Sequence, residues 1–202
     1  MPLSIKWGVA SRPLPGQQES GDQLVVKPFP GGVLMAVLDG VGHGIEAATA
    51  AMIARDIIET HPADPVVALV QRCHKALHAT RGVAVSMASL NTLHGLLTWI
   101  GVGNVVGVLL HPYVAPFRTE KSLLLRAGVV GLQLPSSFGS YSVRVSEGDT
   151  LVFATDGIQS DFARGLAASQ PPQKAAEIIM AQHGRTTDDA LVLVVRFLSG
   201  RP

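Results

Sequence analysis

The pattern of hydrophobic and polar positions predicts three short strands near the start of the chain. They are expected over residues 5–10, which alternate loosely, and over the mainly apolar residues 24–27 and 33–38. Residues 11–21 contain two prolines and two glycines and are expected to form a loop. The sequence Pro-Phe-Pro-Gly-Gly over residues 28–32 predicts a turn between the second and third strands.

The pattern then changes to the helical period over residues 44–60 and 65–80. The first helix is expected to bury a face made of Ile45, Ala48, Met52, Ile53 and Ile57. The second is expected to bury a stripe made of Val66, Leu69, Val70, Cys73 and Leu77. A third helix is expected over residues 171–183. Each helix therefore offers one apolar stripe to a larger core.

Strand patterns fill most of the remaining chain. They are expected over residues 83–90, 95–102, 105–111, 121–126, 141–145, 150–154 and 191–197. Gly103-Asn104 lies between two apolar runs and predicts a tight hairpin turn. Because strands and helices are segregated along the chain, an α+β fold is favoured over an alternating parallel α/β fold. We expect a sandwich of two antiparallel sheets flanked by helices, in one domain over residues 1–202.

Composition narrows the class of protein. The chain has 202 residues, 47% of them apolar and 15% charged, which indicates a compact globule with a sizeable core. The net charge of +1 gives no reason to expect nucleic acid or a membrane as a partner. Cys73 is the only cysteine, so an internal disulfide is excluded and a reducing cytoplasm is expected. Residues 96–110, the longest apolar stretch, are too short and too rich in glycine for a membrane span.

Acidic residues recur at the ends of the apolar runs. A lone Asp-Gly after a strand is usually only a turn, but several in one small domain can converge at one edge of the fold. Converging carboxylates repel one another unless cations lie between them, and their hard oxygens suit Mg²⁺ or Mn²⁺. The acidic positions are Asp22, Asp39, Asp156, Asp188 and Asp189, and glycine follows two of them, at Gly40 and Gly157. The sequence therefore predicts a site for two divalent ions.

Four motifs carry a resemblance to a known family. They are Ser20-Gly-Asp22, Leu38-Asp-Gly-Val-Gly-His-Gly44, Thr155-Asp-Gly157 and Thr187-Asp-Asp189. In this order they resemble the metal-dependent PPM (PP2C-like) serine/threonine phosphatases, in particular the bacterial SpoIIE/RsbU branch and its stand-alone RsbX type. The resemblance covers nearly the whole chain and implies a β-sandwich flanked by helices, with a two-metal phosphatase site at one end.

The resemblance also implies roles for individual residues. Asp39 would bridge two Mn²⁺ or Mg²⁺ ions, with the Gly40 carbonyl on one of them, and Asp156 and Asp188 would complete the second. Asp39 and Asp156 are thus the expected catalytic carboxylates, joined by His43 as a candidate general acid that could equally cap the following helix. Residues expected to support the ions without binding them directly are Asp22, Asp189 and Gly157.

The chain departs from the family pattern at two places. Many eukaryotic members have a histidine directly after the Asp-Gly pair, where this chain has Val41. Many also have an arginine shortly before the first acidic turn, whereas the nearest here is Arg12, ten residues before Asp22. Phosphate binding would then rest mainly on the metal ions. A covalent intermediate is not needed, so Cys73 is expected to be a buried structural thiol.

The resemblance implies a partner as well as a reaction. Substrates would be phosphoserine or phosphothreonine on STAS-domain proteins of a stressosome-like complex, dephosphorylated by a monomer to reset a bacterial stress-response switch. One alternative is a binding module that has the fold but little or no activity. Another is a histidine-kinase-type ATP-binding serine kinase, whose glycine box the Asp39–Gly44 motif could mimic. That family needs an asparagine on an earlier helix, and the only asparagines here are Asn91 and Asn104.

Overall fold

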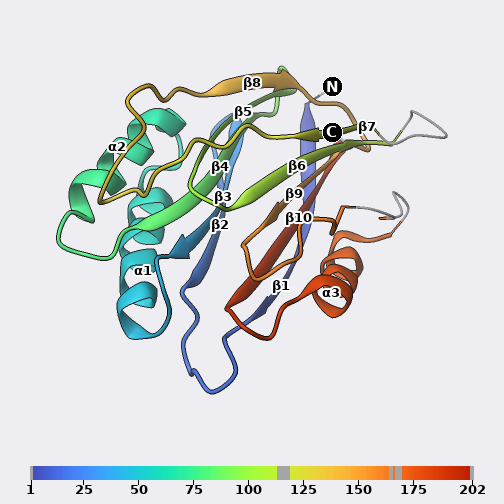
Figure 1. The fold of residues 1–202 in the computed structure, drawn as a ribbon. Helices are drawn as coiled ribbons and strands as arrows, with labels where there is room; N and C mark the ends of the chain where they lie inside the picture. Colours follow the sequence, from blue (N-terminus) through green and yellow to red (C-terminus); the bar gives the residue numbers. More distant parts are fainter. Residues whose placement is uncertain (1, 113–118, 164–165, 167–169, 201–202) are drawn as a thin grey trace.

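The computed structural model describes residues 2–112, 119–163, 166 and 170–200 (Figure 1). The strands within these residues are β1 (Leu3–Arg12), β2 (Asp22–Phe29), β3 (Gly32–Gly40), β4 (Val83–Asn91), β5 (Leu96–Val102), β6 (Val106–His111), β7 (Thr119–Ser122), β8 (Tyr141–Arg144), β9 (Thr150–Ala154) and β10 (Ala190–Ser199). The helices are α1 (Ile45–Thr60), α2 (Val66–Ala76) and α3 (Pro172–His183). None of the described helices combines the length and apolar character that a bilayer crossing requires.

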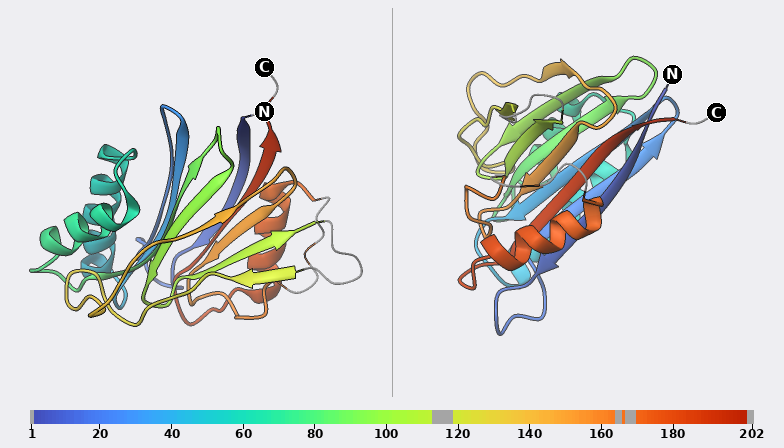
Figure 2. Two further views of the ribbon diagram at one scale, coloured as in Figure 1. Left: turned by 90° about the horizontal axis from the view of Figure 1, so that it is seen from above. Right: turned by 90° about the vertical axis from the view of Figure 1, so that its right-hand side faces the viewer.

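The strands form two antiparallel sheets that pack face to face. One sheet has the order β1-β10-β9-β6-β7 and the other the order β2-β3-β4-β5-β8. Helices α1 and α2 cover the outer face of the second sheet, and α3 covers the outer face of the first (Figures 1 and 2). This four-layer arrangement confirms the predicted α+β sandwich flanked by helices.

The apolar core follows these layers. The cluster between the sheets contains Leu97, Phe153 and Phe197, all fully buried. Val192 and Ile179 belong to the cluster between the first sheet and α3. A further cluster joins the second sheet to α1 and α2. Every strand of the central pairs β3–β4 and β9–β10 is therefore covered on both faces, which explains their nearly unbroken apolar sequences.

The inward face of α1 agrees with the predicted one in part: Ala48 is buried and Ile53 and Ile57 pack against the core, whereas Ile45 and Met52 do not. The residues it buries are Ala47, Ala48, Ala50, Ala51, Ala54 and Ile58. Ile45, by contrast, is 72% exposed, and Met52 also faces outward. The prediction followed the largest apolar side chains, but the alanines let the helix approach the sheet closely: a Cβ on Gly40 would lie 2.1 Å from the Ala47 carbonyl oxygen. The stripe predicted for the second helix is confirmed, because all five of its residues are buried.

Two predictions after residue 100 are wrong. Gly103-Asn104 does not close a hairpin, because β5 and β6 belong to different sheets. The pair is a crossover, held where the Gly103 N–H donates to the Arg126 carbonyl at 2.9 Å. The strand expected over residues 121–126 is also displaced, since β7 ends at Ser122. The chain then leaves the first sheet and reaches the second, where Arg126 forms a single bridge to Val102.

Candidate metal centre

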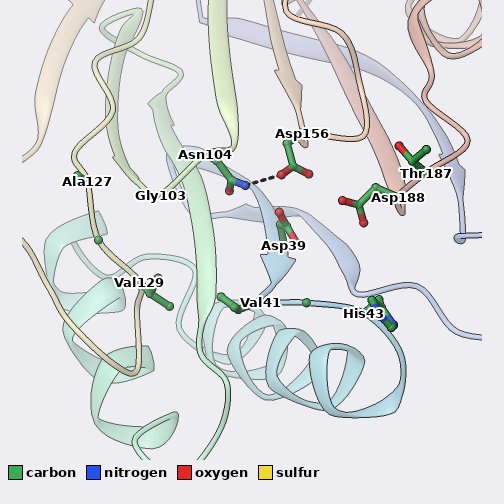
Figure 3. Close-up of a pocket in the computed structure, with 12 residues that line it drawn as sticks. Asp39, Val41, His43, Gly103, Asn104, Ala127, Val129, Asp156, Thr187 and Asp188 are labelled. Carbon is green, nitrogen blue, oxygen red and sulfur yellow. Dashed lines mark hydrogen bonds between the residues drawn. The ribbon is translucent and has the colours of Figure 1, made fainter.

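Three of the predicted carboxylates meet at one end of the sandwich. Asp39 lies near the end of β3, Asp156 follows β9 closely, and Asp188 precedes β10. All three line one cavity of about 530 Å³ and point toward a shared space (Figure 3). The other residues that line it are Val41, Gly42, His43, Gly103, Asn104, Ala127, Gly128, Val129 and Thr187. The predicted convergence of Asp39, Asp156 and Asp188 is thus present in the fold.

Glycines allow the segments that carry these aspartates to approach one another. A Cβ on Gly157 would lie 1.9 Å from the Asp189 carbonyl oxygen, so only glycine lets the turn after β9 contact the start of β10. Gly40 is needed where β3 packs against α1, as described above. This packing against α1 is a sufficient reason for glycine at position 40. The metal role that the resemblance implies for the Gly40 carbonyl stays a prediction.

Asn104 is a member of the site that the sequence argument missed. Its Nδ2 donates to Asp156 Oδ2 at 2.8 Å, which fixes the orientation of that exposed carboxylate. The crossover between β5 and β6 carries Asn104 to this end of the molecule. The predicted hairpin gave no indication that the Asn104 side chain lies next to the acidic residues. The signal in the sequence was a polar residue, Asn104, between two apolar runs. The hairpin interpretation treated it as a turn residue only.

Burial and neighbouring carboxylates raise the pKa values of Asp39 and Asp188. Burial raises the pKa of Asp39 to about 7, and the charges of Asp156 and Asp188 add to this effect, while the Asn104 amide opposes it. Burial and the charge of Asp156 also raise the pKa of Asp188, and nearby His43 lowers it. The protein alone therefore leaves negative charge uncompensated in this cavity.

Asp22 lies behind these residues and is only 4% exposed. It is paired directly opposite Asp39 in the β2–β3 ladder. The Thr155 hydroxyl donates to Asp22 Oδ2 at 2.8 Å and accepts from the Leu191 N–H at 2.9 Å. Burial, followed by the charge of Asp39, raises the pKa of Asp22 to about 8. Asp22 does not line the cavity, so its support of the ions stays a prediction.

Asp189 and Arg12 hold the neighbouring loops. Asp189 is buried, and its two carboxylate oxygens accept from the backbone N–H groups of Leu14 at 2.7 Å and Gly21 at 2.8 Å. Asp189 therefore anchors the loop between β1 and β2. The Arg12 guanidinium donates to the Arg185 carbonyl and thus braces the segment that leads to Asp188. Neither side chain lines the cavity, and the expectation that phosphate binding rests mainly on the metal ions stays a prediction.

His43 lies at the exposed mouth of the cavity, in the turn between β3 and α1. No side-chain hydrogen bond caps the N-terminus of α1, so the capping role considered for His43 is not present. Its imidazole is close enough to Asp188 to affect the pKa of that carboxylate. A proton donor at the mouth can reach a leaving group that points toward solvent.

The donor set suits Mg²⁺ or Mn²⁺. The three aspartates present hard oxygens, and the described residues that line the cavity include no lysine or arginine. Across the described residues, no group of three or more His, Cys, Asp or Glu side chains is placed so that it could hold a metal ion by itself. Mg²⁺ usually binds one or two carboxylates and retains several waters, so it does not require such a group.

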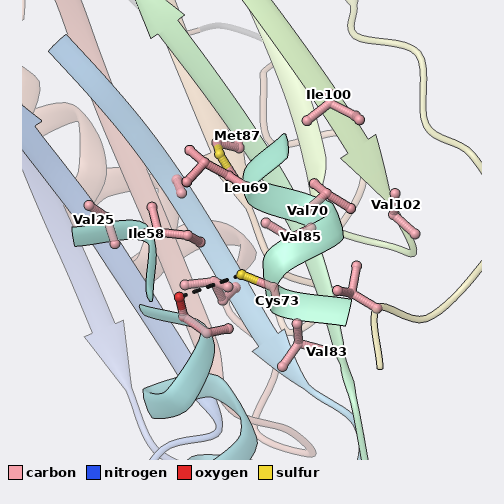
Figure 4. Close-up of a cluster of buried hydrophobic side chains, with 14 of the residues drawn as sticks. Val25, Ile58, Leu69, Val70, Cys73, Val83, Val85, Met87, Ile100 and Val102 are labelled. Atoms are coloured by element: carbon pink, nitrogen blue, oxygen red, sulfur yellow. Dashed lines mark hydrogen bonds between the residues drawn. The ribbon is translucent and has the colours of Figure 1, made fainter. Parts of the chain in front are cut away.

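Cys73 has no part in this site. It is buried between α2 and the second sheet, and its thiol donates to the Ala54 carbonyl at 3.8 Å (Figure 4). Burial raises the pKa of the Cys73 thiol to about 12, so a reactive thiolate is not available near neutral pH. This environment confirms the expected buried structural thiol.

Replacing Cys73 with serine is therefore expected to leave kcat/KM within about twofold of the wild-type value, while a buried hydroxyl costs about 1–2 kcal/mol of stability. Phosphatase assays and thermal unfolding of the two proteins measure these effects. A folded Cys73→Ser protein without activity would contradict the structural assignment of this thiol.

Comparison with known proteins places these features in a family. The sequence model of Stage II sporulation protein E (SpoIIE) matches residues 30–198. The phosphoserine phosphatase RsbX of Bacillus subtilis (strain 168) is 25% identical over 143 residues, which cover 71% of this chain and 69% of that protein. A solved structure from work on the bacterial stressosome as a modular system that controls secondary messenger signalling is 29% identical, with a TM-score of 0.87 over 96% of this chain and 100% of its own. The structure of RsbX in complex with magnesium is 21% identical, with a TM-score of 0.83 over 96% of this chain and 95% of its own.

Proposed function

The chain belongs to the SpoIIE family of PP2C-like phosphatases, and from this membership we propose that it is a metal-dependent protein serine/threonine phosphatase. Its substrates would be phosphoserine and phosphothreonine monoesters on other proteins. The observation that carries the proposal is the convergence of Asp39, Asp156 and Asp188 in one cavity whose described lining includes no lysine or arginine. The structure of the relative RsbX with magnesium supports the choice of a divalent ion.

Two ions, Mg²⁺ or Mn²⁺, would be held by this donor set. Asp39 would lie between them, the Gly40 carbonyl would bind one, and Asp156 and Asp188 would bind the other. When bound, such ions offset the charge of the phosphoryl group and activate water for attack. Asn104 keeps Asp156 Oδ2 in place through its 2.8 Å hydrogen bond, so the carboxylate needs little reorganisation on binding.

The remaining polar groups of the site have two proposed roles, proton transfer and support of Asp39. His43, at the exposed mouth of the cavity, would donate a proton from its imidazole to the departing serine oxygen. Asp22 and Thr155 form a buried support behind Asp39, since Asp22 is paired opposite it and receives the Thr155 hydroxyl hydrogen bond. An open cavity at the surface suits a phosphorylated residue presented by a docked protein.

The partner we propose is a phosphorylated STAS-domain protein of a stressosome-like complex. This proposal is supported by the 29% identical structure from work on the bacterial stressosome and by the relative RsbX. Removal of the phosphate would reset a stress-response switch. We further propose that the protein acts in the cytoplasm as a monomer, in line with its single buried cysteine.

A metal-dependence assay tests the proposed function. The purified protein is expected to hydrolyse para-nitrophenyl phosphate and a phosphorylated STAS-domain protein in the presence of Mn²⁺ or Mg²⁺, and to lose this turnover in excess EDTA. Turnover that is unaffected by EDTA would contradict the metal assignment. Binding of the phosphoprotein without turnover, with either ion, would favour the inactive binding module. Saturable binding of ATP would favour the kinase alternative, against which the matched family and fold argue.

A further inference from the structure

The catalytic cavity has two chemically different sides (Figure 3). On one side of Asp39 lie polar side chains, those of His43, Thr187 and Asp188. On the other side lies an apolar wall, formed by Val41, Ala127 and Val129. Consecutive Cα atoms of a peptide are about 3.8 Å apart, so the residue next to one whose phosphate lies over Asp39 can reach this wall.

The apolar wall is exposed and continues outside the cavity. Val41 is 38% exposed, and Leu132, which lies next to Val129, is 55% exposed. The Val129 and Leu132 side chains both pack over Gly82, where a Cβ would lie 2.6 Å from Val129 Cγ1 and 3.4 Å from Leu132 Cγ. Single exposed apolar side chains need no explanation, but several together at the rim of a cavity are typical of a binding surface.

Backbone hydrogen bonds hold the apolar wall in place. The Val41 N–H donates to the Gly82 carbonyl at 3.1 Å. Val129 and Gln133 exchange two hydrogen bonds, in which the N–H of each donates to the carbonyl of the other at 2.8 and 2.9 Å. Gly82 has a φ of 74°, and a side chain there would also collide with Val129, so glycine is required where the two segments meet. A preformed surface of this kind loses little conformational entropy when it binds a ligand.

The charges next to the turn that carries Val41 are balanced. The Arg81 guanidinium lies against Gly42, where a Cβ would be 2.8 Å from Arg81 Nη1, and it pairs with Glu46. Neither Arg81 nor Glu46 lines the catalytic cavity. The apolar wall therefore offers methyl groups and no ionic partner. Burial of a charged side chain against it would be unfavourable, whereas burial of an apolar side chain is favourable.

We propose that the apolar wall binds an apolar side chain of the phosphoprotein substrate, from a residue directly next to the phosphorylated one in the sequence. The inference rests on the proposed phosphoprotein phosphatase function, because that function places a phosphorylated residue in the cavity that the wall lines. Val41, Ala127 and Val129 thus determine sequence specificity and take no part in the chemistry of the phosphate. A branched aliphatic side chain such as leucine is the expected occupant, because its burial leaves no polar group unpaired.

Two matched phosphoserine peptides test this specificity. One carries leucine on both sides of the phosphoserine, and the other carries asparagine, which has nearly the same shape but a polar end. The wild-type protein is expected to prefer the leucine peptide by about tenfold in kcat/KM, the scale for partial burial of one aliphatic side chain. The ratio of the two kcat/KM values is the readout, because a general loss of activity in a variant affects both peptides equally.

Threonine has almost the shape of valine but carries a hydroxyl, so it tests the polarity of the apolar wall. Val41→Thr and Val129→Thr are each expected to reduce the preference to about threefold, and the double variant to about one. Val129→Ile keeps an apolar side chain and should retain most of the preference. Leu93→Asn is the matched control. Leu93 is 67% exposed and lies in the turn before β5, at the opposite end of that strand from Gly103, so this variant should keep the tenfold preference.

The possible results separate this inference from the proposed function. Equal kcat/KM values for the two peptides in the wild-type protein would overturn the role of the apolar wall alone. A double variant that is folded, as thermal unfolding shows, and keeps the tenfold preference would also overturn it, because the apolar residue would then bind elsewhere. If the double variant does not fold, an unchanged preference in both single variants has the same meaning. Absence of wild-type turnover on para-nitrophenyl phosphate, phosphopeptides and phosphoprotein alike would overturn the proposed function itself.

Discussion

Replacing Asp39 with asparagine is expected to lower kcat/KM by roughly a thousandfold or more with either Mn²⁺ or Mg²⁺. Asp39 is the central carboxylate of the cavity, and it faces the same space as Asp156 and Asp188 in Figure 3. An amide has nearly the same shape but no charge, so the variant loses the ligand proposed to lie between the ions. Steady-state assays on para-nitrophenyl phosphate and on a phosphoprotein measure the loss.

The same variant should fold at least as well as the wild-type protein when no metal is present. Burial and the neighbouring charges raise the pKa of Asp39 to about 7, so its charge is unfavourable in the folded state at higher pH. Asp39→Asn removes that cost, and its unfolding midpoint at pH 8 without metal should equal or exceed that of the wild type. Asp64→Asn, at the exposed pair with Arg72, should keep full activity. A folded Asp39→Asn protein with substantial turnover would remove the basis of the metal-centre assignment.

The stability of the metal-free protein is expected to fall as the pH rises from about 4 to 8. Folding raises the pKa values of Asp39 and Asp22 to about 7 and about 8, whereas an aspartate in the unfolded chain titrates near 3.8. Between these limits the folded state binds more protons than the unfolded state, so rising pH favours unfolding. The expected loss is on the order of a few kcal/mol, or about 10 °C in the thermal midpoint. Thermal unfolding in EDTA across this pH range measures it.

Two further samples make this pH dependence specific to the acidic site. The double variant Asp22→Asn/Asp39→Asn should show a much flatter dependence, because the two carboxyl groups with strongly raised pKa values are gone. For the wild-type protein at pH 8, saturating Mg²⁺ or Mn²⁺ should raise the thermal midpoint again, because an ion that binds only the folded state stabilises that state. If the wild-type and double-variant midpoints changed equally with pH, the cause would lie elsewhere in the protein.

The fold could be predicted from the sequence because strands and helices are segregated and strongly patterned. Errors arose where tertiary context outweighs local signals. Pro28 was expected to begin a turn, yet β2 runs through it to Phe29. This is possible because β2 is an edge strand, where a missing N–H need not break a ladder. Gly103-Asn104 has the sequence of a hairpin turn, and only the partners of β5 and β6 show that it connects two sheets.

The carboxylates of the site could be found because acidic residues after apolar strands are rare enough to stand out in the sequence. Their supporting residues could not. Asn104 and Thr155 donate hydrogen bonds to Asp156 and Asp22 that depend on the packing of distant segments. The contacts of Asp189 with the Leu14 and Gly21 N–H groups could not be predicted either, and its support of the ions stays a prediction. Local sequence shows which groups can bind, but it does not show which atoms the fold presents to them.

The acidic residues are divided between the two halves of the sandwich. Asp39 belongs to one sheet, while Asp156 and Asp188 adjoin β9 and β10 of the other. Divalent ions bound between them would link the two sheets. The affinity for these ions would then depend on how closely the two sheets pack against each other. Truncating a large side chain of the core between the sheets, such as Phe153, would let the two sheets shift relative to each other. Ion binding would be weakened although Phe153 is not a ligand. Catalysis in this protein would thus be sensitive to packing far from any reacting atom.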